Sequence, residues 1–207
     1  MKNTNALEYI AVFTGIASVW FSRKENTWVY PTGLVSTVIY IYLSFKVGLF
    51  GEGSVNFYYT VMSIYGWILW TRKDDRHQLL LKISSATKKE WAHHIGFCLF
   101  FYLVIFGILY WLKRNNYSQE TIPWADAFAS STAFTGMWLM AKKKVESWYW
   151  WIATNIASIP LYFVKLYVFT SVYYLVLLLM AIYGLLEWKK REHAHGLPRN
   201  NTSHLTA

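Results

Sequence analysis

The stretch MSIYGWILW at residues 62–70 returns as MAIYGLLEW at residues 180–188, and this pair decides the expected fold. Both copies follow the pattern Met-x-x-Tyr-Gly-x-x-x-Trp, and a run of basic residues comes after each one. Self-similarity at a fixed separation is the sequence signature of an internal repeat. The chain is therefore expected to contain two related units.

Further matches extend the repeat toward the N-terminal side of each copy. Trp20 and Trp138 have the same separation as the two Tyr-Gly motifs, and a small gap aligns Trp28 with Trp148. We therefore expect four segments: a three-helix repeat at 1–71, a loop plus linker helix at 72–121, the second three-helix repeat at 122–191 and a disordered tail at 192–207.

The composition indicates that the solvent of this chain is a lipid bilayer. Hydrophobic residues make up 55% of the 207 residues and charged residues only 15%, whereas charged residues average about 25% in soluble domains. Aromatic residues add up to 20%, and the single Cys98 excludes a disulfide framework and a cysteine zinc site. Disordered chains and ordinary cytosolic enzymes are excluded as classes.

Seven uncharged or nearly uncharged stretches have about the length that a helix needs to cross a bilayer. They are residues 6–21, 28–45, 55–70, 95–112, 122–141, 148–164 and 171–188. Two three-helix units in direct succession would lie in opposite orientations, and one intervening helix restores the orientation of the second. We therefore expect an all-α integral membrane protein with seven transmembrane helices in a 3+1+3 parallel repeat, an arrangement known from transporters.

The basic residues predict the orientation of the chain in the membrane. Fifteen of the 20 Lys and Arg residues fall in one set of alternate loops and in the C-terminal tail, and five fall on the other side. Because cytoplasmic loops carry the excess of Lys and Arg, the N-terminus is expected outside and the C-terminus inside. The net charge of +9 is thereby explained without nucleic-acid binding.

The segment 148–164 carries the strongest polar stripe. Trp148, Trp151, Asn155, Ser158 and Tyr162 are spaced by three or four residues and share one helical face. Asn155 is expected near the middle of the bilayer, where its amide needs either a ligand or a neighbouring helix as partner. An indole such as that of Trp151 can stack on a flat cation, whereas Trp148 fits either that role or an interfacial position.

Other candidate residues come from the remaining segments. Asp126 either attracts a cationic solute, pairs with Lys165 or reaches water, and Asn56 and Tyr59 are placed at the outer rim of the site. Trp67 and Tyr183 are ring-bearing candidates whose alternative role is helix packing. The substrate-binding set is therefore Trp148, Trp151, Asn155, Ser158, Tyr162, Asn56, Tyr59, Trp67, Asp126 and Tyr183.

A membrane enzyme and a purely structural membrane protein are the alternatives from other classes. The chain has no His-Glu-x-x-His motif and no Gly-rich nucleotide loop followed by Lys-Ser/Thr. We expect no catalytic residues, no metal and no cofactor, and a small-molecule transporter is the favoured interpretation.

Three motifs together resemble the PnuC family of vitamin-precursor transporters, which is related in fold to the SWEET sugar transporters. They are Asn26-x-Trp28-x-Tyr30-Pro31-x-Gly33, the run from Asn56-x-x-Tyr59 to the first Tyr-Gly motif, and Glu146-x-Trp148-x-x-Trp151 leading to Asn155. The resemblance covers residues 6–190.

The resemblance implies facilitated uptake of nicotinamide riboside through the bacterial cytoplasmic (inner) membrane, with intracellular phosphorylation trapping the product. It also implies a homotrimer and a substrate site at the interface of the two repeats, lined by the helix of Trp148 and Trp151, with Asn155 at its polar position. Thiamine, which related proteins carry, is the alternative substrate, because both solutes are planar cations with hydroxyl groups.

Overall fold

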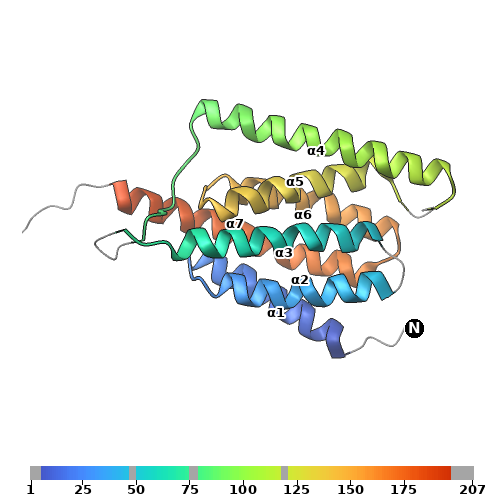
Figure 1. Cartoon of the computed structure of the whole chain (residues 1–207), viewed down its shortest axis with the longest axis horizontal. Helices are drawn as coiled ribbons and strands as arrows, with labels where there is room; N and C mark the ends of the chain where they lie inside the picture. Colours follow the sequence, from blue (N-terminus) through green and yellow to red (C-terminus); the bar gives the residue numbers. More distant parts are fainter. Residues whose placement is uncertain (1–5, 47–49, 75–78, 118–120, 197–207) are drawn as a thin grey trace, which may run out of the picture.

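The computed structural model describes residues 6–46, 50–74, 79–117 and 121–196, and these form an all-α fold of seven helices (Figure 1). The helices are α1 (Ala6–Arg23), α2 (Val29–Lys46), α3 (Phe50–Thr71), α4 (Lys88–Arg114), α5 (Pro123–Ala141), α6 (Ser147–Val164) and α7 (Val168–Gly196). Each helix covers one of the seven stretches expected from the sequence to within one residue, so the number and order of the helices are confirmed for the described residues.

Three helices are clearly longer than the stretches expected from the sequence, and the first of them, α3, begins at residue 50 instead of residue 55. Helix α4 begins at Lys88 instead of residue 95, because Thr87 and Glu90 form a capping box in which each side chain accepts a hydrogen bond from the backbone N–H of the other. Helix α7 continues to Gly196, so residues 192–196 are helical where a disordered tail was expected. The rest of that tail lies outside the described residues.

The helices form two triads that face each other. In the first triad α1 packs on α2 and α2 on α3, and in the second triad α5 packs on α6 and α6 on α7. The triads meet along two seams, one between α3 and α5 and one between α1 and α7. Helix α4 packs on α5 at the outside of this bundle, as Figure 1 shows. Six helices thus enclose a central space, and α4 lies apart from it.

Long apolar surfaces are exposed on this bundle. Helices α4 and α7 are long and apolar enough to cross a membrane by length and composition. On α4 the side chains of Ile95, Leu99 and Leu103 are more than half exposed, and their spacing of four residues places them on one face of the helix. A soluble monomer does not tolerate an apolar face of this length, so these side chains are suited to contact lipid or another protein.

The loops divide the molecule into two ends. The basic end contains the described residues of the connections after α1, α3 and α5, namely 24–28, 72–74, 79–87 and 142–146, together with the last turns of α7, at the left in Figure 1. The opposite end contains the beginning of α1 at Ala6, the end of α4, the beginning of α5 and the connection 165–167. Segment 79–87 contacts the second triad at the basic end, where Ile83 is buried and Val145 donates a backbone hydrogen bond to Ser84.

Candidate functional site

A cavity of about 110 Å³ lies between the two triads, on the side of the basic end. Helices α1, α2 and α3 supply one wall, and α5, α6 and α7 supply the other. The lining residues are Ser18, Val19, Ser22, Val29, Tyr30, Ser63, Met137, Met140, Ala141, Trp148, Trp151, Asn155, Leu177 and Ala181.

Three of the residues expected from the sequence line this cavity, namely Trp148, Trp151 and Asn155. Trp148 is 1% exposed, so the indole is enclosed by protein and does not face lipid at a membrane interface. Asn155 is 3% exposed, and none of the described residues exchanges a hydrogen bond with its amide. A buried amide without a protein partner is costly, which makes Asn155 a candidate ligand for a solute.

Ser158 and Tyr162 continue the face of α6 toward the opposite end, beyond the residues that line the cavity. Ser158 is 1% exposed. The Tyr162 ring stacks on Tyr174 at a centroid distance of 5.1 Å, and the Lys165 ammonium lies 5.8 Å from the centroid of the same ring. Aromatic packing therefore separates the cavity from the opposite end.

The remaining candidates on α3 and α7 lie at different distances from the cavity. The Tyr59 ring is 6.1 Å from the Trp151 ring, next to the cavity wall. Asn56 is one helical turn further away and donates to the Glu52 carbonyl oxygen. Trp67 is 40% exposed and Tyr183 60% exposed, and neither lines the cavity.

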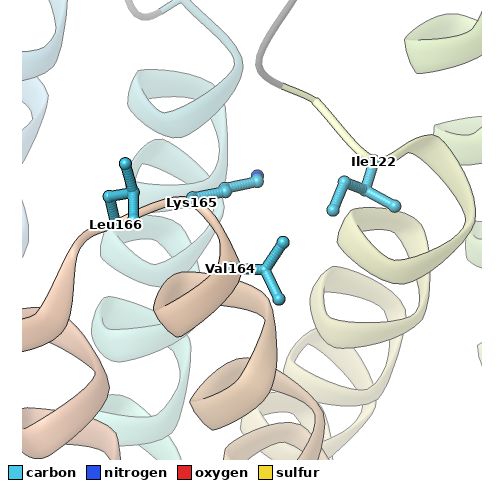
Figure 2. A pocket seen from close by; sticks show the side chains of 4 residues that line it. All are labelled: Ile122, Val164, Lys165 and Leu166. Atoms are coloured by element: carbon cyan, nitrogen blue, oxygen red, sulfur yellow. The ribbon is translucent and has the colours of Figure 1, made fainter.

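Asp126 forms an ion pair with Lys165 at the opposite end. One carboxylate oxygen lies 2.6 Å from the Lys165 Nζ, and the other accepts a hydrogen bond of 2.7 Å from the backbone N–H of Ile122. Of the three roles considered for Asp126, the structure shows the pairing with Lys165. Figure 2 shows the adjoining surface depression of about 270 Å³, which Ile122, Val164, Lys165 and Leu166 line.

The first triad contributes residues that the sequence analysis missed. Ser18, Ser22, Tyr30 and Ser63 line the cavity opposite the indoles of α6. Tyr30 could have been found, because Tyr30 and Trp148 have the same separation as the two Tyr-Gly motifs. The small gap that aligned Trp28 with Trp148 hid this relation.

Two glycines seat the large rings that line the cavity. A Cβ atom on Gly66 would lie 2.5 Å from the Tyr30 Oη, and a Cβ on Gly184 would lie 2.5 Å from the Trp148 ring. No side chain tolerates such a contact without displacement of the ring. The Tyr-Gly motifs thus matter because each glycine receives an aromatic ring from the neighbouring helix of its own triad.

Two tryptophans close the basic end of the cavity. The Trp188 Nε1 donates to the Ser22 carbonyl oxygen at 3.0 Å, and the Trp70 Nε1 donates to the Met140 carbonyl oxygen at 3.3 Å. Each bond therefore crosses from one triad to the other. The two indoles also contact each other at a centroid distance of 6.0 Å, and both are buried.

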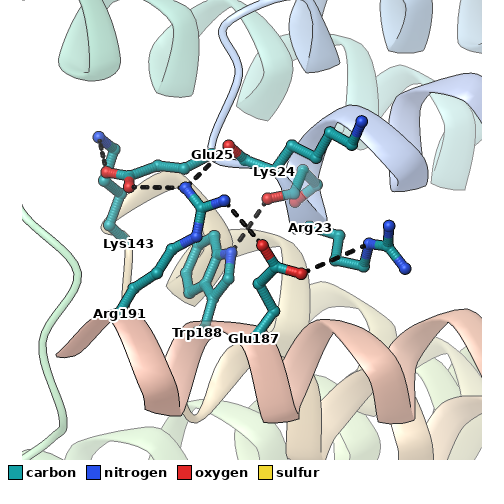
Figure 3. Close-up of polar contacts among 8 residues, drawn as sticks. Arg23, Lys24, Glu25, Lys143, Glu187, Trp188 and Arg191 are labelled. Atoms are coloured by element: carbon teal, nitrogen blue, oxygen red, sulfur yellow. Dashed lines mark hydrogen bonds and ion pairs between the residues drawn. The ribbon is translucent and has the colours of Figure 1, made fainter. Parts of the chain in front are cut away.

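An ion-pair network lies beside these tryptophans at the basic end, and Figure 3 shows it around Trp188. The Lys143 Nζ lies 2.7 Å from the Glu25 carboxylate and 4.8 Å from the centroid of the Trp70 ring, and Lys143 is 1% exposed. Arg191 on α7 lies 3.6 Å from Glu25 and 2.8 Å from Glu187. The network thus joins the loop after α1 to the loop after α5 and to the end of α7.

Glu25 and Lys143 lie in turns of the same conformation, one after α1 and the other after α5. Both residues have a positive φ, 58° and 51°, and each follows the end of a helix. The Glu25 N–H donates to the Ser22 carbonyl and the Lys143 N–H donates to the Met140 carbonyl. Glu25 and Lys143 are 118 residues apart, and so are Ser22 and Met140, whose Oγ and Sδ lie 2.9 Å apart.

The chemistry of the cavity suits a flat solute without negative charge. Its lining contains indoles, hydroxyls, thioethers and one amide, and within the described part of the chain no charged side chain lines it. The described residues also contain no group of three or more His, Cys, Asp or Glu side chains that could hold a metal ion. At about 110 Å³ the cavity is smaller than the roughly 300–1,000 Å³ of typical ligand pockets. A nucleoside-sized solute therefore needs more space than the cavity offers in this structure.

A model of the nicotinamide mononucleotide transporter family matches residues 5–190 of the chain. The chain is 22% identical over 185 residues to the riboflavin/roseoflavin transporter RibM of Streptomyces davaonensis, with 89% of this chain and 84% of RibM covered. It is 24% identical over 204 residues to the nicotinamide riboside transporter PnuC of Neisseria mucosa, with 91% and 74% covered.

The fold is similar to that of a solved transporter. The crystal structure of the vitamin B3 transporter PnuC superposes with a TM-score of 0.74 at 24% sequence identity. The match covers 93% of this chain and 85% of the other. The seven helices are therefore arranged as in that protein.

Proposed function

Because the chain belongs to the nicotinamide mononucleotide transporter family, we propose that it is a membrane transporter that imports nicotinamide riboside by facilitated diffusion. The observation that carries the choice of solute is the cavity, in which the Asn155 amide lies one turn from the Trp151 indole on α6. An indole can stack on the nicotinamide ring, which carries a positive charge, while an amide can donate to and accept from polar groups of the solute.

The uncharged lining favours the riboside over its phosphorylated form. A phosphate group brings negative charge, and burying that charge without a cation or a set of donors is strongly unfavourable. Lys143, the buried cation beside Trp70 at the basic end, is already paired with Glu25 at 2.7 Å. We therefore propose that the mononucleotide is excluded. Thiamine remains the alternative solute, and riboflavin is tested beside it because RibM is a relative.

We also propose that the two triads are 3+1+3 parallel repeats that rock about the cavity to give alternating access. Three observations support this. The helix contacts within each triad and across the two seams correspond one to one. Trp188 of the second triad donates a hydrogen bond to the first triad, and Trp70 of the first triad donates one to the second. Glu25 and Lys143, which contact each other, are 118 residues apart, the same separation as the two Tyr-Gly motifs. Contacts between equivalent residues of two repeats are expected when a two-fold axis relates the repeats.

Membrane crossing by all seven helices and the orientation of the chain belong to the same proposal. We propose that the basic end faces the cytoplasm, since its loops carry most of the Lys and Arg residues. Three further predictions rest on the family resemblance. They are the location in the bacterial inner membrane, the homotrimer and the trapping of the solute by intracellular phosphorylation.

We propose a route for the solute that begins at the opposite end. Asp126, Asn56, Tyr162, Ser158 and Tyr59 lie between that end and the cavity, and the solute passes them before it reaches the indoles. Asp126 is neutralised by Lys165 in this state, so we propose that its carboxylate attracts a cationic solute only when that ion pair opens. Trp67 and Tyr183 are instead assigned to the outer surface of the bundle, because both are substantially exposed and neither lines the cavity.

Uptake into sealed liposomes tests the proposed function. Protein reconstituted without any kinase is expected to equilibrate labelled nicotinamide riboside across the membrane, and an excess of unlabelled nicotinamide mononucleotide is expected not to compete. Competition by thiamine and by riboflavin is measured in the same assay. Uptake of thiamine alone would select the alternative, and uptake of none of these solutes would overturn the proposal.

Asn155→Ala tests whether the cavity is the binding site. Loss of one hydrogen bond to a buried polar group is worth about 1–1.5 kcal/mol, so nicotinamide riboside is expected to bind about tenfold more weakly by calorimetry. Ser171→Ala is the matched control, because the Ser171 Oγ donates to the Ile159 carbonyl away from the cavity. Wild-type affinity in Asn155→Ala would place the site elsewhere.

A further inference from the structure

One face of α1 carries large rings that no other part of the bundle covers. Tyr9, Phe13 and Trp20 are 57%, 68% and 43% exposed. With 3.6 residues per turn, these three side chains lie within about 40° of one another around the helix, and we call them the α1 stripe. The stripe is about 16 Å long, close to half of the roughly 30 Å hydrocarbon core of a bilayer. It therefore has the length of one leaflet.

The equivalent face of α5 is covered. The residues 118 positions after the α1 stripe are Ala127, Ser131 and Trp138, and the first two are fully buried. Helix α4 covers this face, where the Phe97 ring stacks on Trp138 at a centroid distance of 4.6 Å. Within the described part of the chain, α1 packs only on α2 and α7. The first triad thus lacks a counterpart of α4, and its stripe is open to a molecule from outside the chain.

Two cations lie at the basic end of the α1 stripe. The Arg23 Cζ is 4.1 Å and the Lys24 Nζ is 4.9 Å from the centroid of the Trp20 ring. Because they follow Trp20 by three and four residues, the two side chains start on opposite sides of the stripe. Their charges converge over one ring, so a single phosphate group can contact both.

The covered face of α5 has only one of these cations. The Lys142 Nζ lies 4.2 Å from the centroid of the Trp138 ring, as Lys24 lies over Trp20. At the position that corresponds to Arg23, the second triad has Ala141. The second cation is therefore present only where the face is open.

The protein neutralises these two cations incompletely. The Arg23 Nε lies 4.0 Å from Glu187 and is buried without a hydrogen-bond partner, while Glu187 is already paired with Arg191 at 2.8 Å. Figure 3 shows the two terminal nitrogens of Arg23 directed away from Glu187. No carboxylate of the described residues forms an ion pair with Lys24. Both side chains are thus able to bind an anion.

The charge at this end favours a lipid over a second copy of the chain. Copies in one membrane share one orientation, so a neighbouring copy would bring its own basic end to the level of Arg23 and Lys24. Like charges at an interface are unfavourable. An anionic phospholipid instead brings negative charge to this level and an acyl chain to the apolar stripe below it.

We propose that the α1 stripe with Arg23 and Lys24 binds one anionic phospholipid of the leaflet at the basic end. The phosphate lies between the guanidinium and the ammonium, and an acyl chain lies along Phe13 and Tyr9. The lipid takes the place on the first triad that α4 takes on the second. The inference goes beyond the transported solute and rests on the proposed function only for the crossing of the membrane by α1.

Native mass spectrometry of the full chain in detergent tests the site. Phosphatidylglycerol, which is anionic, and phosphatidylcholine with the same acyl chains are titrated separately, and the affinity for the first bound lipid is measured. Each Lys or Arg near an anionic lipid surface strengthens binding about fivefold, so wild type is expected to prefer phosphatidylglycerol by at least about tenfold. In the double variant Arg23→Gln/Lys24→Gln the two affinities are expected to agree within about twofold.

The matched control is the double variant Lys189→Gln/Lys190→Gln, which removes the same charge from the same end of the molecule. The Lys189 Nζ lies over the Tyr149 ring at 5.3 Å and not over the α1 stripe. This variant is expected to keep the wild-type preference. An equal loss of preference in both double variants would show a response to net charge alone and overturn the site. An unchanged preference in Arg23→Gln/Lys24→Gln would also overturn it.

Photo-crosslinking in liposomes that contain phosphatidylglycerol identifies what covers the stripe. With p-benzoylphenylalanine in place of Phe13, the cross-linked product is expected to be chain plus lipid. A product of two chains would assign the stripe to a second copy and overturn the proposal. Neither experiment uses nicotinamide riboside, so failure of the lipid site and failure of the proposed solute give different results.

Discussion

Gly66 and Gly184 each accept the edge of an aromatic ring against a helix backbone. The absence of a side chain at these positions allows Tyr30 and Trp148 to lie flat between neighbouring helices, where they line the cavity. The role is one of space, because both glycines lie inside helices and need no unusual backbone conformation. At the residue scale, the positions of these two rings in the cavity walls thus depend on the absence of a Cβ atom at Gly66 and at Gly184.

Gly66→Ala and Gly184→Ala are each expected to destabilise the protein by about 1–3 kcal/mol, because the added methyl group overpacks the ring contact. The measurement is the midpoint of thermal unfolding in detergent, together with the affinity for nicotinamide riboside, which is expected to fall as the ring shifts. Gly96→Ala on α4 is the matched control, since a Cβ there would have no neighbour within 4 Å.

The control should instead gain stability, by up to about 1 kcal/mol, because alanine is the better helix former. Unfolding midpoints for Gly66→Ala and Gly184→Ala that equal or exceed that of Gly96→Ala would contradict the assigned role.

At the scale of the elements, the ends of α1, α5 and α7 meet at the basic end. The loop after α1 supplies Glu25, the loop after α5 supplies Lys143, and α7 supplies Trp188 and Arg191. An almost fully buried ammonium needs its carboxylate, since an unpaired buried charge is strongly unfavourable. The contact therefore joins the two triads at this end, and in the proposed alternating-access cycle it has to break before the cavity opens toward this end.

Glu25→Gln is expected to favour the state that is open at the basic end. The experiment uses a Cys98→Ala background with the substitution Ala181→Cys on the cavity wall. A membrane-impermeant maleimide is added from the basic end, and the rate at which it modifies this cysteine measures how often the cavity is open to that end. A hydrogen bond to a charged group contributes about 1.5–3 kcal/mol, so modification is expected to be at least about tenfold faster in Glu25→Gln.

Glu90→Gln is the control for this experiment. Glu90 pairs with Lys144 at 2.8 Å at the same end of the molecule, but this pair is more exposed and joins α4 to the second triad instead of joining the triads. Exposed pairs contribute little, so Glu90→Gln is expected to label at the wild-type rate. Equal rates in Glu25→Gln and wild type would contradict closure by Glu25.

The starts and ends of the helices were predictable only in part. The pattern Thr87-x-x-Glu90 is a capping box in the sequence, and it begins α4 seven residues before the apolar stretch that the sequence analysis used. Helix α7 also continues through charged residues, where Glu192 accepts hydrogen bonds from the Ser85 backbone N–H and hydroxyl. Apolar length indicates the part of a helix that a bilayer could surround, whereas caps and tertiary contacts decide where the helix ends.

At the scale of the whole molecule, the loops and helix ends that carry most of the Lys and Arg residues lie at one end of the bundle (Figure 1). The exposed apolar faces of helices such as α4 run from this end to the other. The charge asymmetry predicts a single orientation, with the C-terminus in the cytoplasm and the N-terminus outside.

Reporter fusions test this orientation. A fluorescent protein fused after the C-terminus is expected to fluoresce in cells, and alkaline phosphatase at the same place is expected to be inactive, because each reporter folds on only one side of the membrane. Phosphatase fused at the connection 115–122 of the opposite end is the matched positive control. An active phosphatase at the C-terminus would contradict the orientation and with it the assignment of the basic end to the cytoplasm.

The sequence by itself determined the class of the protein, the seven helices and the residues of α6 that share a face. These follow from local rules: composition, apolar length and the helical period. The repeated Tyr-Gly motif also led to the expectation of two related units, because a recurring motif needs no knowledge of contacts.

Only the tertiary structure decided which helix faces pack against each other and which of them line the cavity. It buried Trp148, paired Asp126 with Lys165, left Trp67 and Tyr183 at the surface, and brought Tyr30 and Ser63 to the cavity. Periodicity relates residues three or four positions apart, but the cavity joins side chains from helices more than 100 residues apart in the chain. Their partners depend on how the two triads pack, and local sequence does not encode that packing in any pattern that can be read segment by segment.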